Sequence, residues 1–102
     1  FRQDVLRTLN VRRAKAGLKP LRMNVKALNE AAQQYTRNPD LNPWQLLNEK
    51  KVFWSKACSC SGWGEVSKIA RDDWYPDAVL NPDYKTIGVG MLDGAWRIYF
   101  IG

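Results

Sequence analysis

The chain has 102 residues, of which 45% are hydrophobic and 25% charged, and its longest uninterrupted apolar run is residues 98–101. This composition is typical of one globular domain over residues 1–102. It excludes a disordered chain, a collagen-like chain and a membrane-spanning helix, which needs about 20 apolar residues. Because the sequence has no histidine, Ser-His and Cys-His nucleophile pairs, histidine zinc sites and imidazole acid/base chemistry are excluded as well.

The positive charge is concentrated near the N-terminus. Residues 1–26 hold eight of the 16 Lys and Arg side chains and a single acid, Asp4, whereas the rest of the chain is close to neutral. The net charge of +6 therefore belongs to the N-terminal segment. Phe1 is not an initiator methionine and no apolar signal-peptide core follows it, so we expect a processed chain or a fragment of a longer one.

Two helices are predicted in the first part of the chain. Over residues 4–16, apolar side chains recur at helical spacing with arginines on the other side, and Gly17 ends the helix. A second helix is predicted over 24–37, capped by the asparagine at its start. Residues 38–43 are rich in Asn and Pro, which predicts a turn, and a short helical turn is expected at 44–48.

Strands are predicted in the second part. β-Branched and aromatic residues predict strands at 51–57 and 63–69, with a loop over 58–62 between them. Residues 71–82 are rich in turn-forming residues, and the two prolines there disfavour a long helix.

The last stretch predicts a β-hairpin. Strands over 85–91 and 96–101 flank Asp93-Gly94, which suits a type I′ turn because both central positions need positive φ. Helices followed by hairpin-connected strands indicate an α+β domain with a mainly antiparallel sheet.

Three groups of residues resemble motifs of the CAP superfamily, the SCP-like domains of cysteine-rich secretory, antigen 5 and pathogenesis-related class 1 proteins. The opening of these domains is similar to Asn10-x-x-Arg13-x-x-x-Gly17-Leu18-x-Pro20-Leu21 followed by Leu28-x-x-x-Ala32. The start of the family's Gly-Glu-Asn motif resembles Gly64-Glu65. The closing motif before the final hairpin is similar to Asn81-Pro82-x-Tyr84-x-x-Ile87-Gly88-Val89-Gly90.

The resemblance implies an α-β-α sandwich, usually in a secreted protein that binds sterols, lipids, glycans or peptides. The family's cavity usually presents two histidines with nearby glutamates, and some members bind a divalent metal there. In this chain Tyr35 occupies the position where relatives often carry the first histidine, and residues 76–81 lack the second. Only Glu65 has a counterpart among the cavity residues, so we expect a degenerate site with no metal and no cofactor.

Aromatic side chains near Glu65 are expected to line a ligand groove, because a preformed concave site binds through apolar burial and a few polar contacts. The expected binding residues are Tyr35, Trp54, Trp63, Glu65, Trp74 and Asp77. The other interpretation is that most aromatic residues form the core and that Glu65 pairs with a basic residue to hold a loop.

The basic face of the first helix suggests an alternative function, in which it binds polyanions or anionic membranes. The other interpretation is that this face is only exposed to solvent. Its residues are Arg2, Arg12, Lys15 and Lys19, whereas Arg13 is expected to pair internally. A third hypothesis is a hydrolase that uses Glu65 with Asp77 or Tyr35.

Two further clusters keep their alternatives open. Cys58 and Cys60 could form a strained bridge, a redox-active pair or two structural thiols. Asp72, Asp73, Asp77 and Asp83 could hold Ca²⁺, although turn-forming aspartates explain them better.

We therefore expect a non-catalytic binding module, extracellular or in the cell envelope, with an apolar and aromatic groove for a lipid, glycan or peptide. Nucleic acid is not an expected partner, because the basic residues and the aromatic residues lie in different parts of the sequence.

Overall fold

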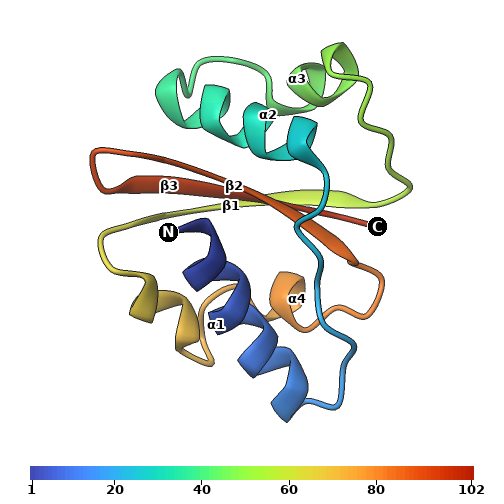
Figure 1. The fold of residues 1–102 in the computed structure, drawn as a ribbon, viewed down its shortest axis with the longest axis vertical. Coiled ribbons are helices and arrows are strands. Elements are labelled where there is room, and N and C mark those ends of the chain that lie inside the picture. Colours follow the sequence, from blue (N-terminus) through green and yellow to red (C-terminus); the bar gives the residue numbers. More distant parts are fainter.

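The computed structural model describes residues 1–102 and has three layers, with a sheet between two sets of helices (Figure 1). In chain order the elements are α1 (Arg2–Lys15), α2 (Lys26–Arg37), α3 (Pro43–Glu49), β1 (Ala57–Trp63), the 3-10 helix η1 (Val66–Ala70), α4 (Pro76–Val79), β2 (Thr86–Leu92) and β3 (Ala95–Ile101). None of the helices combines the length and the hydrophobicity that crossing a bilayer requires. The expected α+β class and α-β-α sandwich are confirmed.

The sheet is antiparallel, in the order β1-β3-β2, so the C-terminal strand is central. Ile98 of β3 lies opposite Cys60 of β1 on one side and Val89 of β2 on the other. The predicted hairpin is β2–β3, and its turn residues Asp93 and Gly94 have φ of 51° and 84°, as a type I′ turn requires.

The two faces of the sheet are covered by different helices. Side chains alternate along a strand, so Trp96, Ile98 and Phe100 pack against α1, η1 and α4. Tyr99 and Ile101 face the other way, toward α2 and α3. A core therefore lies on each side of the sheet, the larger one on the side of α1.

Helix α2 packs very closely on β2. A Cβ atom added at Gly88 would collide with Leu28, and one at Gly90 would collide with the backbone of Ala32 and Gln33. The glycines of the segment Gly88-Val89-Gly90 are therefore needed for close packing of this helix on the sheet.

The strand predictions for residues 51–69 were wrong. The segment 58–62, expected to be a loop, is the body of β1, and η1 occupies most of the expected second strand. The sequence of β1, Ala-Cys-Ser-Cys-Ser-Gly-Trp, has little β-propensity, so its strand conformation results from pairing with β3, far away in the chain.

The helix predictions are confirmed, with shifted ends. α1 begins at Arg2, and α2 begins at Lys26 with Val25 as its N-cap, so Asn24 does not cap it. The helical turn expected at 44–48 is α3. It is capped by the side chain of Asn42, which accepts hydrogen bonds from the backbone N–H groups of Trp44 and Gln45 at 2.9 and 3.1 Å.

Candidate functional site

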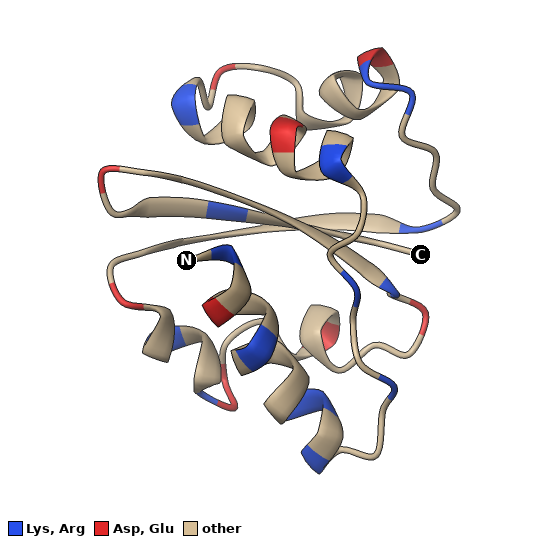
Figure 2. Ribbon diagram, viewed as in Figure 1, with Lys and Arg blue, Asp and Glu red and all other residues tan.

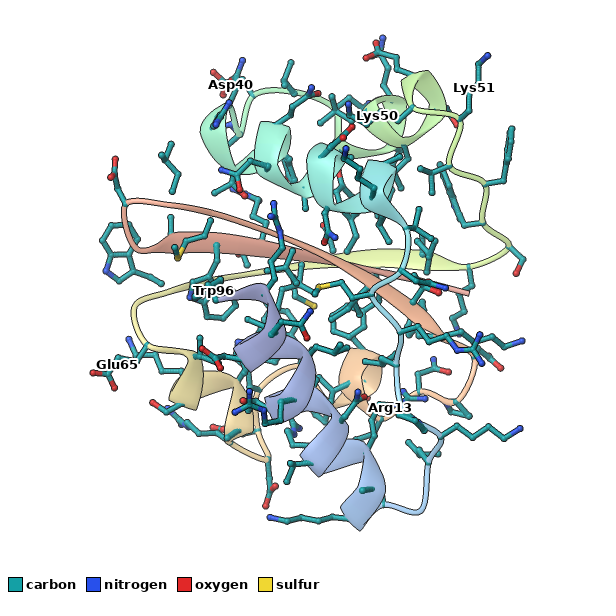
Figure 3. All side chains as sticks on the ribbon, in the orientation of Figure 1. Arg13, Asp40, Lys50, Lys51, Glu65 and Trp96 are labelled. Carbon is teal, nitrogen blue, oxygen red and sulfur yellow. The ribbon has the colours of Figure 1, made fainter.

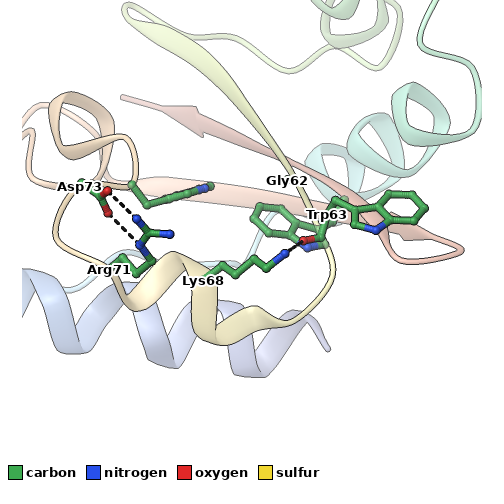
Figure 4. A pocket seen from close by; sticks show the side chains of 7 residues that line it. Gly62, Trp63, Lys68, Arg71 and Asp73 are labelled. Carbon is green, nitrogen blue, oxygen red and sulfur yellow. Dashed lines mark hydrogen bonds and ion pairs between the residues drawn. The ribbon is translucent and has the colours of Figure 1, made fainter.

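The tryptophan cleft is a cavity of about 210 Å³ between the end of β1 and the segment that follows it (Figure 4). It is lined by Gly62, Trp63, Lys68, Arg71, Asp73, Trp74 and Trp96. The packed indoles of Trp74 and Trp96 contribute apolar surface, and three charged side chains stand beside them. Trp63 lines the edge of the cleft, and its indole extends away from Arg71 and Asp73, toward the β2–β3 turn (Figure 4). Such a site suits a ligand with an aromatic or aliphatic part and at least one polar group.

The floor of the cleft is fixed by Trp96. This side chain is almost fully buried, and its indole Nε1–H donates to the Gly64 carbonyl at 3.2 Å. Gly62 lies opposite Trp96 in the sheet, and any Cβ atom there would overlap the indole ring. The ring of Trp74 packs on Trp96 with their centroids 5.6 Å apart.

The rim of the cleft is polar and exposed. Arg71 donates two hydrogen bonds to Asp73, at 3.1 and 2.7 Å, and the Lys68 ammonium donates to the Trp63 carbonyl at 3.1 Å (Figure 4). Trp63 itself is 64% exposed, an unusual position for so large an apolar side chain. Lys68 and Arg71 therefore place two positive charges at the rim of the cleft.

Arg12 holds the segment that carries the cleft. Its guanidinium donates to three backbone carbonyls of that segment, those of Ile69 at 3.1 Å, Trp74 at 2.7 Å and Asp72 at 3.0 Å. Burial lowers the pKa of Arg12, and the nearby carboxylates of Asp72 and Asp73 oppose this shift. The prediction that Arg12 belongs to an exposed basic face was therefore wrong, since its side chain is buried.

Arg13 holds the neighbouring segment in the same way. It is buried and donates to the carbonyls of Lys19, Val79, Asn81 and Tyr84 at 2.7 to 3.3 Å. Figure 3 shows it between α1 and the α4 region. The expectation that Arg13 pairs internally agrees with these contacts.

The six expected binding residues do not share one site. Trp63 and Trp74 line the tryptophan cleft, whereas Glu65 at the start of η1 is exposed and extends away from the molecule (Figure 3). Its carboxylate accepts a hydrogen bond from the Ser67 hydroxyl at 3.3 Å. Asp77 is exposed on α4 and lines a different cavity.

Tyr35 and Trp54 lie on the other side of the sheet. Tyr35 packs against Tyr99, with centroids 6.2 Å apart, and the Arg97 guanidinium stacks over its ring at 4.1 Å. Trp54 packs on Trp44 in the same layer. Because the sheet separates these side chains from Glu65 and Asp77, the suggested hydrolase pairing of Glu65 with Tyr35 is not formed.

Sequence reasoning missed Lys68, Arg71, Asp73 and Trp96 as cleft residues. The position of Trp96 in an alternating hairpin strand predicted that its side chain is buried. It did not predict that this side chain packs beside β1. Lys68 and Arg71 are three residues apart, a spacing that places them on one side of a helical turn. That signal was hidden because residues 63–69 were predicted to be a strand and residues 71–82 to be turns.

The thiol cavity is a second hollow, of about 260 Å³, beneath the other half of β1. It is lined by Cys58, Cys60, Tyr75, Pro76, Asp77 and Tyr84, together with Ser59 and Ala78. Both cysteines are free thiols. No three His, Cys, Asp or Glu side chains lie close enough to one another to hold a metal ion.

The two thiols have different acidities. A hydrogen bond with the Cys60 thiol lowers the pKa of Cys58 to about 6, against the effect of burial, and Tyr84 and Lys56 lower it further. The same hydrogen bond and burial raise the pKa of Cys60. Burial and the contact with Cys58 raise the pKa of Tyr84 to about 12.

Of the four residues predicted to form a basic face, only Arg12 is buried. Lys and Arg lie along α1 and the segment after it (Figure 2). Arg2, Lys15 and Lys19 are exposed, and the Arg2 guanidinium also donates to the Val89 carbonyl at 2.6 Å. The basic cleft, of about 530 Å³, is lined by Lys19, Arg22 and Lys85 together with Arg13, Pro20, Asn24, Pro82, Tyr84 and Thr86.

In comparisons by sequence, no family model and no curated protein matches the chain. In comparisons by structure, the chain is similar to an extracellular protein with an SCP domain from Bacillus anthracis, with a TM-score of 0.79 and 16% sequence identity. The match covers 97% of this chain and 39% of that protein. The chain is also similar to a cysteine-rich secretory protein from Staphylococcus aureus, with a TM-score of 0.81, 18% identity, and 95% of this chain and 36% of that chain covered.

A third similar structure is an outer surface protein from Borrelia burgdorferi, with a TM-score of 0.80, 16% identity, and 97% of this chain and 90% of that chain covered. The chain thus spans less than half the length of the first two proteins and most of the third. At this level of identity the likeness concerns the fold, and the CAP-like fold inferred from the sequence motifs is confirmed.

Proposed function

We propose that this CAP-like domain is a non-catalytic binding module of the cell exterior or envelope. Its tryptophan cleft takes the apolar or aromatic part of a lipid, glycan or peptide. The extracellular and outer-surface descriptions of the similar proteins support this location. The observation that carries the binding function is the packed pair of indoles, Trp74 and Trp96, in one cleft whose edge carries the exposed Trp63.

The chemistry of the cleft supports binding rather than turnover. It contains no histidine, cysteine or serine, and its one carboxylate, on Asp73, is held by Arg71. A group engaged in a bidentate ion pair is a poor general base. Glu65, the residue matched to the family's Gly-Glu-Asn motif, lies outside the cleft.

Three probes cover the proposed ligand classes: palmitate, a tetrasaccharide of N-acetylglucosamine, and a displayed library of random ten-residue peptides. We expect one of the three to bind saturably, with a change in tryptophan fluorescence. Trp74→Ala removes one wall of the cleft and should weaken that binding at least about tenfold. Trp54→Ala is the matched control and should bind as the wild type does, because Trp54 lies on the other side of the sheet.

The proposal fails if none of the probes binds, or if Trp74→Ala binds the probe as tightly as the wild type does. Both variants are first compared with the wild type by circular dichroism and urea unfolding. This step separates a lost contact from a lost fold.

The second candidate function is binding of a polyanion in the basic cleft. Its three exposed cations, Lys19, Arg22 and Lys85, come from two segments, and no acidic side chain lines the cleft. With heparin as the probe, Arg22→Glu and Lys85→Glu should each weaken binding and reduce its dependence on salt. Lys15→Glu, a charge reversal on α1 outside the cleft, is the control. Equal losses in all three variants would contradict a defined site.

A further inference from the structure

The outer edge of β2 is closed by side chains. The Arg2 guanidinium donates to the Val89 carbonyl at 2.6 Å, and the Val89 N–H donates to the side chain of Asn29 at 2.8 Å. The Gln33 amide bonds to both the N–H and the carbonyl of Met91, at 3.0 and 2.6 Å. These contacts leave this edge few free groups for another strand.

The outer edge of β1 is open. At the two ends of its ladder with β3, the Gly102 N–H donates to the Lys56 carbonyl and the Gly64 N–H donates to the Gly94 carbonyl. Since hydrogen-bonded residues alternate along an antiparallel strand, the even-numbered residues of β1 bond to β3. The N–H and C=O groups directed to the free edge belong to Ala57, Ser59 and Ser61, and no protein group bonds to them.

The sequence of β1 lacks the features that usually protect an edge strand. Residues 57–63 include no proline and no charged side chain. From Ala57 to Gly62 no side chain is larger than cysteine, so the side chains of β1 itself leave room for an approaching strand. An unprotected edge of this kind is a template for pairing with another chain.

Two cavities lie along this edge on the same face of the sheet. Cys58, Cys60 and Gly62 all face the side of α1, because side chains alternate along a strand. The thiol cavity adjoins Cys58 and Cys60, and the tryptophan cleft adjoins Gly62. A strand added to β1 would direct every second side chain to this face, and Cys58 and Gly62 are separated by about 13 Å along the strand.

We propose that β1 is the docking edge for an extended peptide segment of a partner protein. This peptide adds a fourth strand and directs apolar side chains at alternate positions toward the thiol cavity and the tryptophan cleft. The inference rests on the proposed function, because it names the ligand class of the tryptophan cleft. Main-chain hydrogen bonds to Ala57, Ser59 and Ser61 supply affinity, and the two cavities supply specificity.

The cavities favour a peptide over a second copy of this chain. If two copies paired antiparallel through β1, only Cys58, Cys60 and Gly62 of one copy would lie on the sheet face that carries the cavities of the other, because side chains alternate along a strand. These side chains are too small to fill hollows of about 260 and 210 Å³. A partner peptide with Leu, Phe or Tyr at alternate positions fills them.

The decisive variant is Ser59→Pro. Proline removes the Ser59 N–H, which faces the free edge, and leaves the hydrogen bonds to β3 intact, as edge-strand prolines do. Ser59→Ala is the matched control, because it removes the hydroxyl and keeps the N–H. The probe is a displayed library of random ten-residue peptides, and the enriched sequences are then synthesised and titrated by calorimetry.

We expect enriched peptides with apolar residues two or four positions apart. Ser59→Pro should bind them at least about tenfold more weakly, from the lost hydrogen bond and the steric effect of the ring. Ser59→Ala should bind within about twofold. In the wild type, the backbone amide hydrogens of Ser59 and Ser61 should exchange quickly in the free protein and slowly when the peptide is bound. This measurement tests whether the peptide pairs with β1 even if Ser59→Pro does not fold.

Three results would overturn the inference: no peptide is enriched, Ser59→Pro binds as the wild type does, or the two amides exchange equally fast with and without peptide. If palmitate or the tetrasaccharide binds through Trp74 and no peptide does, the proposed function stands and the docking edge is wrong. If no probe of any class binds, both fail. If the protein sediments as a dimer and both amides are protected from exchange without peptide, the edge of β1 pairs with a second copy of the chain.

Discussion

Replacing Arg12 by alanine tests the structural role that α1 has beneath the tryptophan cleft. The guanidinium donates three hydrogen bonds, to the carbonyls of Ile69, Asp72 and Trp74, and only 5% of the residue is exposed. Alanine removes all three donors at once. It also leaves a hollow between α1 and the segment that follows η1.

The expected loss follows from these contacts. A hydrogen bond to a charged group contributes about 1.5–3 kcal/mol, and the cost of burying the guanidinium offsets part of the sum. We therefore expect Arg12→Ala to lower the free energy of unfolding by about 3–5 kcal/mol, a large part of the 5–15 kcal/mol that is roughly typical of a domain. At about 4–8 °C for each kcal/mol, Tm should fall by at least about 12 °C.

The assay is urea unfolding followed by tryptophan fluorescence. Arg12→Lys keeps the positive charge, but a single ammonium cannot reach three carbonyls, so it should recover less than half of the loss. Lys15→Ala, on the exposed side of the same helix, should change the stability by no more than about 0.5 kcal/mol. If Arg12→Ala lowered the free energy of unfolding by less than about 1 kcal/mol, the reasoning would be refuted. Arg12 would then behave as an exposed surface residue.

Three further predictions concern the site and its supports. Iodoacetamide should alkylate Cys58 and spare Cys60. The rate of Cys58 alkylation, followed by mass spectrometry, should be constant at high pH and fall as the pH drops through about 6, because the thiolate is then protonated. A midpoint near pH 8.5, roughly the value of an ordinary thiol, would contradict the lowered pKa. Gly62→Ala should destabilise the fold by at least about 2 kcal/mol in urea, because the new methyl group overlaps Trp96, and an unchanged midpoint would contradict that packing. Asn42→Ala should cost about 1 kcal/mol through the lost cap of α3, whereas Asn42→Asp should cost little.

The parts of the fold that local patterns determine were predictable. The helices α1 and α2 follow from apolar residues at helical spacing, and the β2–β3 hairpin follows from Asp93-Gly94 between alternating strands. β1 was not predictable in the same way. Its small residues carry no alternating pattern, and its conformation depends on pairing with β3 about 40 residues later.

The burial of Arg12 had a signal in the sequence that was read only in part. Val5 and Leu9 define the buried side of α1, and positions seven and eight after Val5 continue the same side. Those positions hold Arg12 and Arg13, and of the two only Arg12 was assigned to the exposed side, on its charge alone. Most of the carbonyls that they bind could not be predicted from the sequence, because all the acceptors except the Lys19 carbonyl lie 57 to 71 residues away.

The candidate site was predictable only in part for the same reason. Trp63 and Trp74 were expected near a groove, and they line the tryptophan cleft. Tyr35 and Trp54 were grouped with them by residue type, but the sheet places them on its other side. Which face of a sheet a helix covers is set by tertiary packing, and no local pattern in α2 records it.

The most direct test of the proposed function is an NMR titration that follows the indole N–H signals of the five tryptophans as the bound probe is added. Binding in the tryptophan cleft predicts saturable shifts at Trp63 and Trp74, with Trp54 unmoved. Shifts that appear at Trp54 and leave Trp63 and Trp74 unchanged would contradict it.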